Sequence, residues 1–303
     1  MFTNLNCFWL FLMLLSIFET ILKQSETTLA ALKNIKTMKL YPEAKRIFRE
    51  LDNLGVKENE AIDVKSLFAF DQLHYHGIQS VQACINALNL KRGDKLLEIG
   101  SGWGGPSRYI AHMVGANVEA LELQKDYHNV GCSLTERCGL ADRVAHVCTD
   151  FLTYENKSNH FNNIVSWLAL YHIPNRQKSC LRIFELLKPG GRVFIEDLTL
   201  MNRNANVNWA LLKSDLFVNS LISIDDYKSY FENVGFKIDV CEDMTIDWSE
   251  FTRNRYSNFL ERKNEFINLH GKELFDQMEY FYMKIVEYFN MKAIGGLRLI
   301  CSK

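Results

Sequence analysis

The chain has 303 residues, a formal net charge of −1 and a hydrophobic content of 48%. This length suits one large domain, or a core domain with an added lobe, and the near-neutral charge does not indicate general affinity for nucleic acid. The eight cysteines show no metal-ligand spacing, so we predict no metal site and expect reduced thiols in a cytoplasmic protein.

The amino end carries an apolar run of twelve residues, Cys7–Phe18, which is short for a membrane span. No basic residue precedes it and no small-residue cleavage site follows it, so a signal or a membrane anchor is the minority interpretation. Met38 is an alternative start, which leaves residues 1–37 as an appendage of unclear role. Membrane association is expected only through residues 7–18.

A helical pattern, with apolar residues three and four positions apart, begins near Tyr41 and ends at Gly55. Residues 66–77, SLFAFDQLHYHG, then combine aromatic, acidic, amide and histidine side chains in a turn-rich stretch. Either this stretch packs an aromatic helix face on the main domain, or it is a lid over a ligand. We assign residues 38–90 to a helical lid, which ends in a helix over 79–90.

The strongest motif is the run KLLEIGSGWGGPSR at residues 95–108. A buried strand ends at Ile99 and leads into glycines, and Pro106 suits the first turn of a following helix. This arrangement forms a nucleotide or nucleoside cradle, because the backbone approaches a ligand closely and helix N–H groups point at it. The series G-x-G-x-G-G that starts at Gly100 differs from the G-x-G-x-x-G of nicotinamide-binding proteins.

Further strands are predicted to alternate with helices, as in a doubly wound parallel sheet. They span residues 117–123, 144–148, 161–168 and 192–197. Glu122 closes the first of them about twenty residues beyond the glycines, where a carboxylate accepts hydrogen bonds from both ribose hydroxyls; a surface acid is the alternative. Asp150 and Phe151 follow the next strand. The Asp150 carboxylate can accept a hydrogen bond from an exocyclic amine, and the Phe151 ring can pack against the face of an adenine.

The carboxyl end is predicted to complete the sheet around a helical insertion. We expect helices over 215–234, strands over 236–243 and 297–301, and a long aromatic-rich helical stretch between these two strands. Such an insertion would lie over the crevice and select the substrate, although a cap without ligand contact or a dimer face is the alternative. Arg253 and Arg255 are candidates for binding a substrate carboxylate.

Five elements in order resemble the class I S-adenosylmethionine-dependent methyltransferases over about residues 66–200: EIGSGWGG, the acid of LELQ, the TDF step, the strand end SWLALYH and the turn LLKPGGRVFIED. The resemblance implies an α/β fold with a doubly wound, mostly parallel seven-stranded sheet. The core would span 91–247, a helical cap 248–290 and the final strand 291–303. S-adenosylmethionine is the implied cofactor, a small-molecule methyl acceptor the implied partner, and a homodimer is left open.

The resemblance also implies two sets of site residues. Those that would contact the acceptor and carry the chemistry are His172, Tyr171 and Tyr75. Those that would contact the cofactor are Gln72, Tyr75, Glu98, Gly100, Ser101, Gly102, Gly104, Glu122, Leu123, Asp150, Phe151 and Trp167. Glu98 is expected to act indirectly, by organising the loop or the ammonium end of the cofactor.

The longer string FDQLHYHG…SGWGGPSRYIA…SWLALYHIPNR…EDL resembles small-molecule amine methyltransferases, above all the sarcosine and dimethylglycine N-methyltransferases. Alternatives are a phosphoethanolamine N-methyltransferase, a C-methyltransferase acting on a sterol-like lipid, and a non-catalytic S-adenosylmethionine-binding protein. An aromatic-lined site would suit a cationic product through cation–π contacts. The candidate aromatic residues are Phe70, Tyr75, Trp103 and Tyr171, of which Trp103 would also narrow the mouth of the site.

Overall fold

The structure is a computed structural model that describes residues 43–303, so the predictions for residues 1–37 lie outside the described range. A single sheet of seven strands forms its centre. The strands are β1 (Lys95–Ile99), β2 (Asn117–Glu122), β3 (Val144–Cys148), β4 (Phe161–Trp167), β5 (Leu187–Leu200), β6 (Lys237–Asp243) and β7 (Ile294–Ser302).

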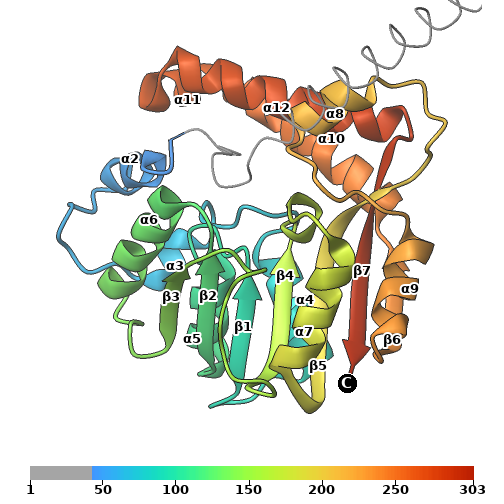
Figure 1. Cartoon of the computed structure of the whole chain (residues 1–303). Helices are drawn as coiled ribbons and strands as arrows, with labels where there is room; N and C mark the ends of the chain where they lie inside the picture. The colour runs from blue at the N-terminus through green and yellow to red at the C-terminus, as the bar shows by residue number, and fades with distance from the viewer. Residues whose placement is uncertain (1–42) are drawn as a thin grey trace, which may run out of the picture. The chain divides into compact units, whose positions relative to one another are not determined.

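The strand order is β3-β2-β1-β4-β5-β7-β6 (Figure 1). Strands β1 to β5 pair in parallel, whereas β7 is antiparallel to both β5 and β6. The order reverses between β1 and β4, which in parallel sheets opens a crevice at the carboxyl ends of the strands. The predicted doubly wound, mostly parallel sheet is confirmed.

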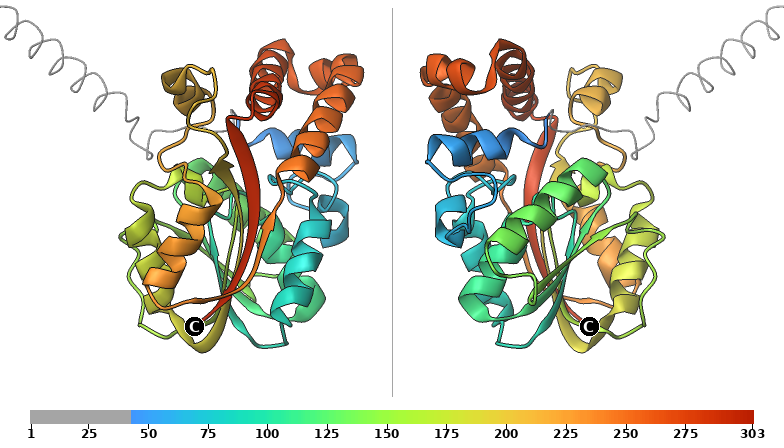
Figure 2. Two further views of the ribbon diagram at one scale, coloured as in Figure 1. Left: turned by 90° about the vertical axis from the view of Figure 1, so that its right-hand side faces the viewer. Right: turned by 90° about the vertical axis from the view of Figure 1, so that its left-hand side faces the viewer.

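Helices cover both faces of this sheet and one of its ends (Figures 1 and 2). They are α2 (Arg46–Asn53), α3 (Val64–Leu67), α4 (Ile78–Leu88), α5 (Gly105–Val114), α6 (Lys125–Arg137), η2 (Leu170–His172), α7 (Arg176–Leu186), α8 (Trp209–Asp215), α9 (Ile224–Asn233), α10 (Thr245–Glu261), α11 (Lys263–His270) and α12 (Lys272–Asn290). One hydrophobic core lies under α7 and α9, and another under α4 and α5. No helix among residues 43–303 has both the length and the apolar composition needed to cross a bilayer.

Strand β5 begins earlier than predicted. We expected a turn over residues 188–191, but β5 starts at Leu187 and continues through this stretch. A register shift accommodates the extra residues, because Phe161 pairs with Leu187 and Asn163 with Arg192. The turn residues therefore form an irregular part of the strand.

The insertion between β6 and β7 consists of α10, α11 and α12, which lie beyond the carboxyl ends of the parallel strands in Figures 1 and 2. Helix α10 packs on α12 and on β7. Its fully buried Trp248 lies directly against Gly296 of β7, where a Cβ atom would collide with the indole ring. Close approach at a glycine thus joins the insertion to the sheet.

This contact leads to a prediction for stability. Gly296→Ala should lower the free energy of unfolding by about 1–3 kcal/mol, because an added methyl group overpacks a filled contact. Urea denaturation measures the change. Ile246→Ala on the same helix is the control, since Ile246 is 86% exposed and its loss should change stability by less than about 0.5 kcal/mol. Equal stability of the wild type and Gly296→Ala would contradict the proposed anchoring.

Candidate functional site

The glycine loop, residues 100–104, connects β1 to α5 and is packed against the segment 68–77. Gly102 has φ 54°, and a Cβ atom there would lie 2.9 Å from Leu73 Cδ1. At Gly105 a Cβ atom would come within 2.5 Å of the carbonyl oxygen of Asp71. We expected the glycines to admit a ligand, but at these two positions they also admit the neighbouring segment of the chain.

A buried ion pair fixes that segment to the loop. Asp71 Oδ2 lies 2.9 Å from Arg108 Nη2, and neither side chain has any exposed surface. Arg108 also donates through Nη1 to the carbonyl oxygen of Trp103 at 2.6 Å. Gln72, predicted as a cofactor contact, donates to Asp71 Oδ1 at 2.7 Å. One guanidinium group therefore holds both the loop backbone and the segment that covers it.

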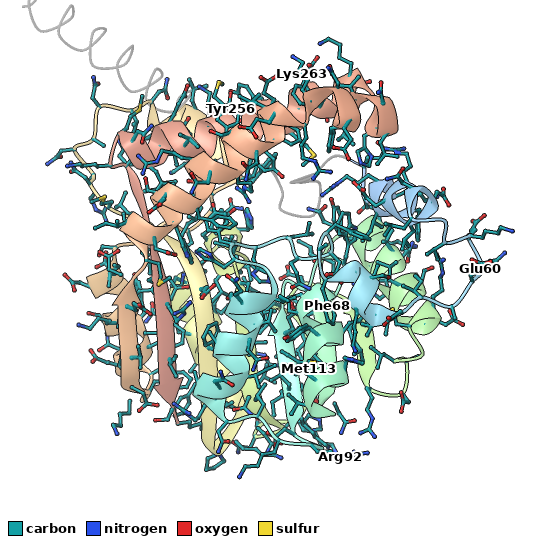
Figure 3. All side chains as sticks on the ribbon, turned by 180° about the vertical axis from the view of Figure 1, so that it is seen from behind. Glu60, Phe68, Arg92, Met113, Tyr256 and Lys263 are labelled. Atoms are coloured by element: carbon teal, nitrogen blue, oxygen red, sulfur yellow. The ribbon has the colours of Figure 1, made fainter. Side chains whose placement is uncertain are left out.

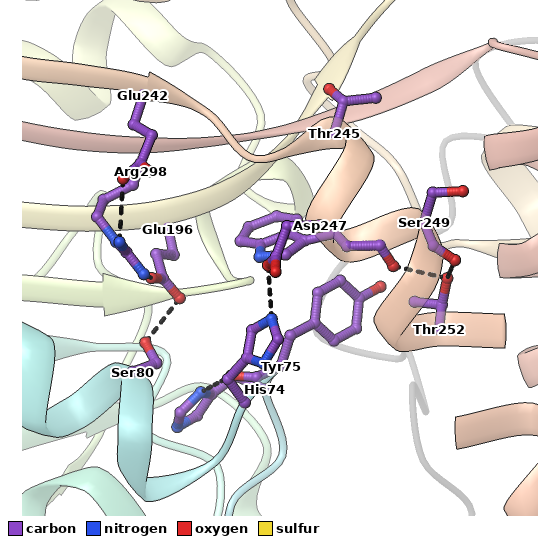
Figure 4. Close-up of polar contacts among 12 residues, drawn as sticks. His74, Tyr75, Ser80, Glu196, Glu242, Thr245, Asp247, Ser249, Thr252 and Arg298 are labelled. Atoms are coloured by element: carbon purple, nitrogen blue, oxygen red, sulfur yellow. Dashed lines mark hydrogen bonds and ion pairs between the residues drawn. The ribbon is translucent and has the colours of Figure 1, made fainter. Parts of the chain in front are cut away.

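The other end of the segment is tied to α10 and to the sheet (Figure 4). His76 Nε2 lies 2.6 Å from Asp247 Oδ2 on α10. At the start of α4, Ser80 donates to Glu196 at 2.7 Å, and Arg298 pairs with the same carboxylate at 2.7 Å. Residues 68–77 are thus attached at both ends.

Glu98 lies below the glycine loop and is 2% exposed. It accepts a hydrogen bond from Ser107 Oγ, which joins the end of β1 to the first turns of α5. Burial raises the pKa of Glu98 to about 8, although the Ser107 hydroxyl and the Arg108 charge oppose this shift. Glu98 thus contacts other residues of the protein, as expected for a residue that organises the glycine loop without touching the cofactor.

Glu122 ends β2 and faces the glycine loop. Its Oε2 accepts from the Gly102 N–H at 2.8 Å, and its Oε1 accepts from the Gln124 N–H at 2.7 Å. Burial raises the pKa of Glu122 to about 7, while these backbone donors lower it. A carboxylate has about four acceptor positions, so these backbone donors do not saturate it.

Ser101 adds a second open position in the loop. Its hydroxyl is buried and meets no hydrogen-bond partner among residues 43–303. A buried polar atom without a partner is costly, so it marks a place where a ligand donor or acceptor fits. Together with the Glu122 carboxylate, the loop offers the polar positions that a nucleoside cofactor requires.

Asp150 follows β3 and closes a turn by accepting from the Leu152 N–H at 2.9 Å through Oδ1. Two other predicted cofactor contacts, Phe151 and Trp167, have buried side chains. Phe151 is 4% exposed and packs under α7. Trp167 is 5% exposed and packs under α4, and its indole N–H donates to Ser80 Oγ at 2.8 Å. Contact of these two side chains with the cofactor stays a prediction, as does that of Leu123, which is half-buried beside Glu122.

His172 lies in η2, directly after β4, and is 6% exposed. Its Nδ1 is 2.9 Å from the carbonyl oxygen of Phe217. A carbonyl oxygen only accepts, so Nδ1 carries the hydrogen and Nε2 keeps a free lone pair. Nε2 is buried without a partner in the described part of the chain, and burial lowers the pKa of His172 to about 4. The ring is therefore a neutral acceptor.

Tyr171 and Tyr75 come together although they are far apart in the sequence. Both are 3% exposed and belong to one buried cluster with Trp248. The Tyr171 ring lies 3.8 Å from that of His172 between centroids, and the Tyr75 ring meets Trp248 edge-on at 5.0 Å. The structure thus brings the three predicted acceptor-side residues to one region, between η2 and α10.

Sequence reasoning missed the residues that hold η2 in place. Asp197 accepts from the Tyr171 N–H at 3.2 Å and pairs with Arg176 at 3.1 Å. The Tyr171 carbonyl oxygen accepts from the backbone N–H groups of Asn219 and Ser220. The sequence placed Asp197 at the end of β5, but no spacing rule pairs it with Arg176.

The prediction for Trp103 is wrong. Trp103 is 1% exposed and stacks on Tyr127 of α6, with a centroid separation of 5.6 Å. The Arg46 guanidinium covers its ring at 4.8 Å. An aromatic residue in a glycine turn was expected to line the mouth of the site, but α2 covers this one.

A cleft of about 890 Å³ lies between the segment 68–77 and helices α10 to α12. In Figure 3, which shows the molecule from behind, the lining residue Phe68 lies below the helices that carry Tyr256 and Lys263. Gln72 lines the cleft, whereas Glu122 and His172 do not. Arg255 also lines it, but Arg253 of the same helix is exposed and does not.

Comparison with known protein families gives a match over most of the described chain. The family described as mycolic acid cyclopropane synthetase matches residues 68–297. A phosphoethanolamine N-methyltransferase from Plasmodium falciparum is 25% identical over 232 residues, which cover 74% of this chain and 82% of that protein. A sterol 24-C-methyltransferase from Yarrowia lipolytica is 29% identical over 171 residues, or 54% of this chain and 44% of that one.

The plant relatives are longer. Phosphoethanolamine N-methyltransferase 1 from Arabidopsis thaliana is 24% identical over 76% of this chain and 46% of its own length, so the chain spans about half of such relatives.

Solved structures share the fold. Phosphoethanolamine N-methyltransferase 2 from Haemonchus contortus has a TM-score of 0.72 and 21% identity, with 84% of this chain and 60% of that chain covered. The cyclopropane synthase MmaA2 from Mycobacterium tuberculosis has a TM-score of 0.66 and 16% identity, with coverages of 88% and 100%. A structure from Galdieria sulphuraria, described as a sarcosine dimethylglycine methyltransferase, has a TM-score of 0.63 and 18% identity, with coverages of 75% and 82%.

The buried ion pair between Asp71 and Arg108 gives a testable prediction. Asp71→Ala should destabilise the protein by about 3–5 kcal/mol in urea denaturation, because it leaves a buried guanidinium without its counter-charge. Asp247→Ala removes the exposed partner of His76 and serves as the control, with an expected loss below about 1 kcal/mol. If both variants lost a similar free energy of unfolding, the burial of the ion pair between Asp71 and Arg108 would not be what makes it important for stability.

Proposed function

Because the chain belongs to the mycolic acid cyclopropane synthetase family, we propose that it is a class I S-adenosylmethionine-dependent methyltransferase. We propose an amine as the first candidate acceptor, such as sarcosine or dimethylglycine. The observation that carries the proposal is the pair of open acceptor sites at the crevice, the Glu122 carboxylate beside the glycine loop and the bare Nε2 of His172.

The residues of the loop fit the proposed cofactor. Glu122 would accept hydrogen bonds from the ribose hydroxyls, Asp150 would face the adenine amine, and Ser101 would meet the cofactor through its unpartnered hydroxyl. The loop contains no lysine, which agrees with a cofactor that carries no phosphate. When bound, S-adenosylmethionine supplies an electrophilic methyl group on a sulfonium centre.

His172 would position the acceptor. Its neutral ring accepts a hydrogen bond at Nε2 from the N–H of a primary or secondary amine such as sarcosine, which directs the nitrogen lone pair away from the ring; neutral dimethylglycine has no N–H and would not be positioned in this way. A low pKa keeps the ring in this form throughout the physiological pH range. Because an in-line displacement depends on alignment, fixing the nucleophile in this way contributes to the rate.

The segment 68–77 would act as a lid. It is attached to the glycine loop through Asp71 and to α10 through His76, so it lies between the cofactor loop and the insertion. A covering segment excludes water and keeps an amine acceptor in its neutral, nucleophilic form. This role would extend from residue 38 to residue 90 if the predicted lid boundaries hold.

The relatives support N-methyl transfer and also favour a second acceptor class. Phosphoethanolamine N-methyltransferases match most of the described chain, which supports a phosphorylated amine as well as sarcosine or dimethylglycine. The sterol 24-C-methyltransferase supports a lipid-like acceptor, and the aromatic residues of α10 to α12 suit such a compound equally well. A non-catalytic cofactor-binding protein is the remaining alternative.

Cofactor binding should depend on pH through Glu122. The pKa of its carboxyl group is raised to about 7 before binding, and donors from a ribose stabilise the anion, so binding lowers this pKa. Affinity for S-adenosylhomocysteine, measured by calorimetry, should therefore be constant above about pH 8 and fall by up to about tenfold per pH unit below about pH 7.

Glu122→Gln should weaken this binding by about 1–3 kcal/mol and remove the pH dependence. Glu136→Gln, at an exposed position of the next helix, α6, should leave both unchanged. Wild-type affinity in Glu122→Gln at pH 8 would refute the ribose assignment.

Turnover should depend on His172. With labelled S-adenosylmethionine and a panel of glycine, sarcosine, dimethylglycine, phosphoethanolamine and a sterol, we expect an amine to be methylated. His172→Ala should lower turnover about 100-fold or more while cofactor affinity stays within about twofold. His112→Ala, an exposed histidine of α5, is the control.

Labelling of the sterol alone would reject the amine proposal, and cofactor binding without any turnover would favour the non-catalytic alternative. Equal turnover in His172→Ala would make His172 structural.

A further inference from the structure

Two arginines face the cleft between residues 68–77 and α10 to α12, and the Nε atom of each is buried without a hydrogen-bond partner among residues 43–303. The first is Arg46, at the start of α2. It is 9% exposed, its guanidinium carbon lies 4.8 Å from the Trp103 ring centroid, and its Nε is buried without a hydrogen-bond partner. Its charge also lowers the pKa values of Glu43 and Glu50, but the Nε–H donor stays available for another group.

The second is Arg255 of α10. Its guanidinium carbon lies 4.9 Å from the Tyr75 ring centroid and 4.4 Å from that of Tyr282. Its Nε is also buried and has no hydrogen-bond partner in the described part of the chain. Two aromatic rings thus hold this cation, and the Tyr75 hydroxyl lies within hydrogen-bonding reach of it.

The other charged groups of the cleft are mostly paired with each other. The pairs are Arg262 with Glu265 at 2.8 Å, His270 with Glu50 at 2.7 Å, and His76 with Asp247 at 2.6 Å. The remaining acid in the lining, Glu250, is exposed. The guanidinium groups of buried Arg46 and half-buried Arg255 are therefore the cations of the cleft whose Nε atoms keep a free donor in the described part of the chain.

The rest of the lining mixes apolar and polar side chains. The apolar ones include Phe70, Leu73, Phe251, Phe259, Phe266 and Met278, and the polar ones include Gln72, Asn254 and Asn258. A volume of about 890 Å³ lies within the range of small-molecule pockets, roughly 300–1,000 Å³. The cleft thus combines aromatic and aliphatic wall residues with two guanidinium groups whose Nε atoms have no hydrogen-bond partner among residues 43–303.

We propose that this cleft binds an amphiphilic anion, a carboxylate or phosphate monoester joined to an apolar body. Arg46 and Arg255 supply the charge-assisted hydrogen bonds to the anionic group, and the aromatic walls cover the apolar body. The occupant touches the lid, because Gln72 and His74 line the same cleft and Arg255 stacks on Tyr75. The site does not depend on the proposed methyl transfer.

The test measures binding to the full chain by calorimetry with three single-chain amphiphiles. Octanoate and octyl phosphate carry the expected charge, and octyltrimethylammonium carries the opposite one. We expect both anions to bind and the cation to bind at least about tenfold more weakly. Whichever anion binds more tightly identifies the preferred head group as carboxylate or phosphate.

Arg255→Gln and Arg46→Gln should each weaken anion binding about tenfold or more, since each removes a charged donor. Arg253→Gln is the matched control, because Arg253 is exposed on the same helix and lies outside the cleft. Arg255→Lys and Arg46→Lys keep the charge and should retain part of the affinity, which preserves the test if a glutamine variant does not fold.

Two results would overturn the proposal: equal binding of octanoate and octyltrimethylammonium, or anion affinities in the Arg46 and Arg255 variants that equal that of Arg253→Gln. S-adenosylhomocysteine binding is measured on the same samples. Its affinity should stay unchanged in the arginine variants, so a failure of this cleft proposal is distinguished from a failure of the cofactor proposal.

Discussion

The buried contact between Arg108 and Asp71 is the constraint on which the candidate site depends. Taking two charges out of water costs several kcal/mol for each ion, so the pair persists only because its geometry and additional hydrogen bonds are favourable. Arg108 also holds the Trp103 carbonyl oxygen, and the Asp71 backbone occupies the space that a side chain at Gly105 would need. The cofactor loop and the segment that covers it are therefore one packed unit.

Two acceptor groups of the candidate site, the Glu122 carboxylate and the His172 ring, are held by the backbone in a similar way. Glu122 is held by backbone N–H groups, and His172 is held by a backbone carbonyl oxygen, so neither can rotate freely. Burial favours the neutral form of both side chains and leaves lone pairs open. Such preorganised groups suit a reaction that depends on alignment and hydrogen bonding. We expect neither a metal nor a covalent intermediate to be needed for it.

The parts of the fold that local patterns determine could be predicted from the sequence. Alternation of short apolar runs with helices indicated the sheet, and Glu122 was found because its distance from the glycines is fixed by one strand-helix-strand unit. Partners far apart in the sequence could not be found, because no spacing rule joins Asp71 to Arg108 or Arg176 to Asp197. Trp103 was misplaced for a related reason: an aromatic residue covers a core or lines a pocket depending on which helix packs over it.

The central claim is that the glycine loop and Glu122 form a nucleoside site beside His172. A crystal structure of the chain with S-adenosylhomocysteine tests it most directly. We predict the ribose hydroxyls at the Glu122 carboxylate, the Ser101 hydroxyl in contact with the ligand, and the sulfur atom on the side of the loop that faces His172. A nucleoside bound elsewhere, or a Glu122 carboxylate that keeps only its backbone donors in the complex, would contradict the account.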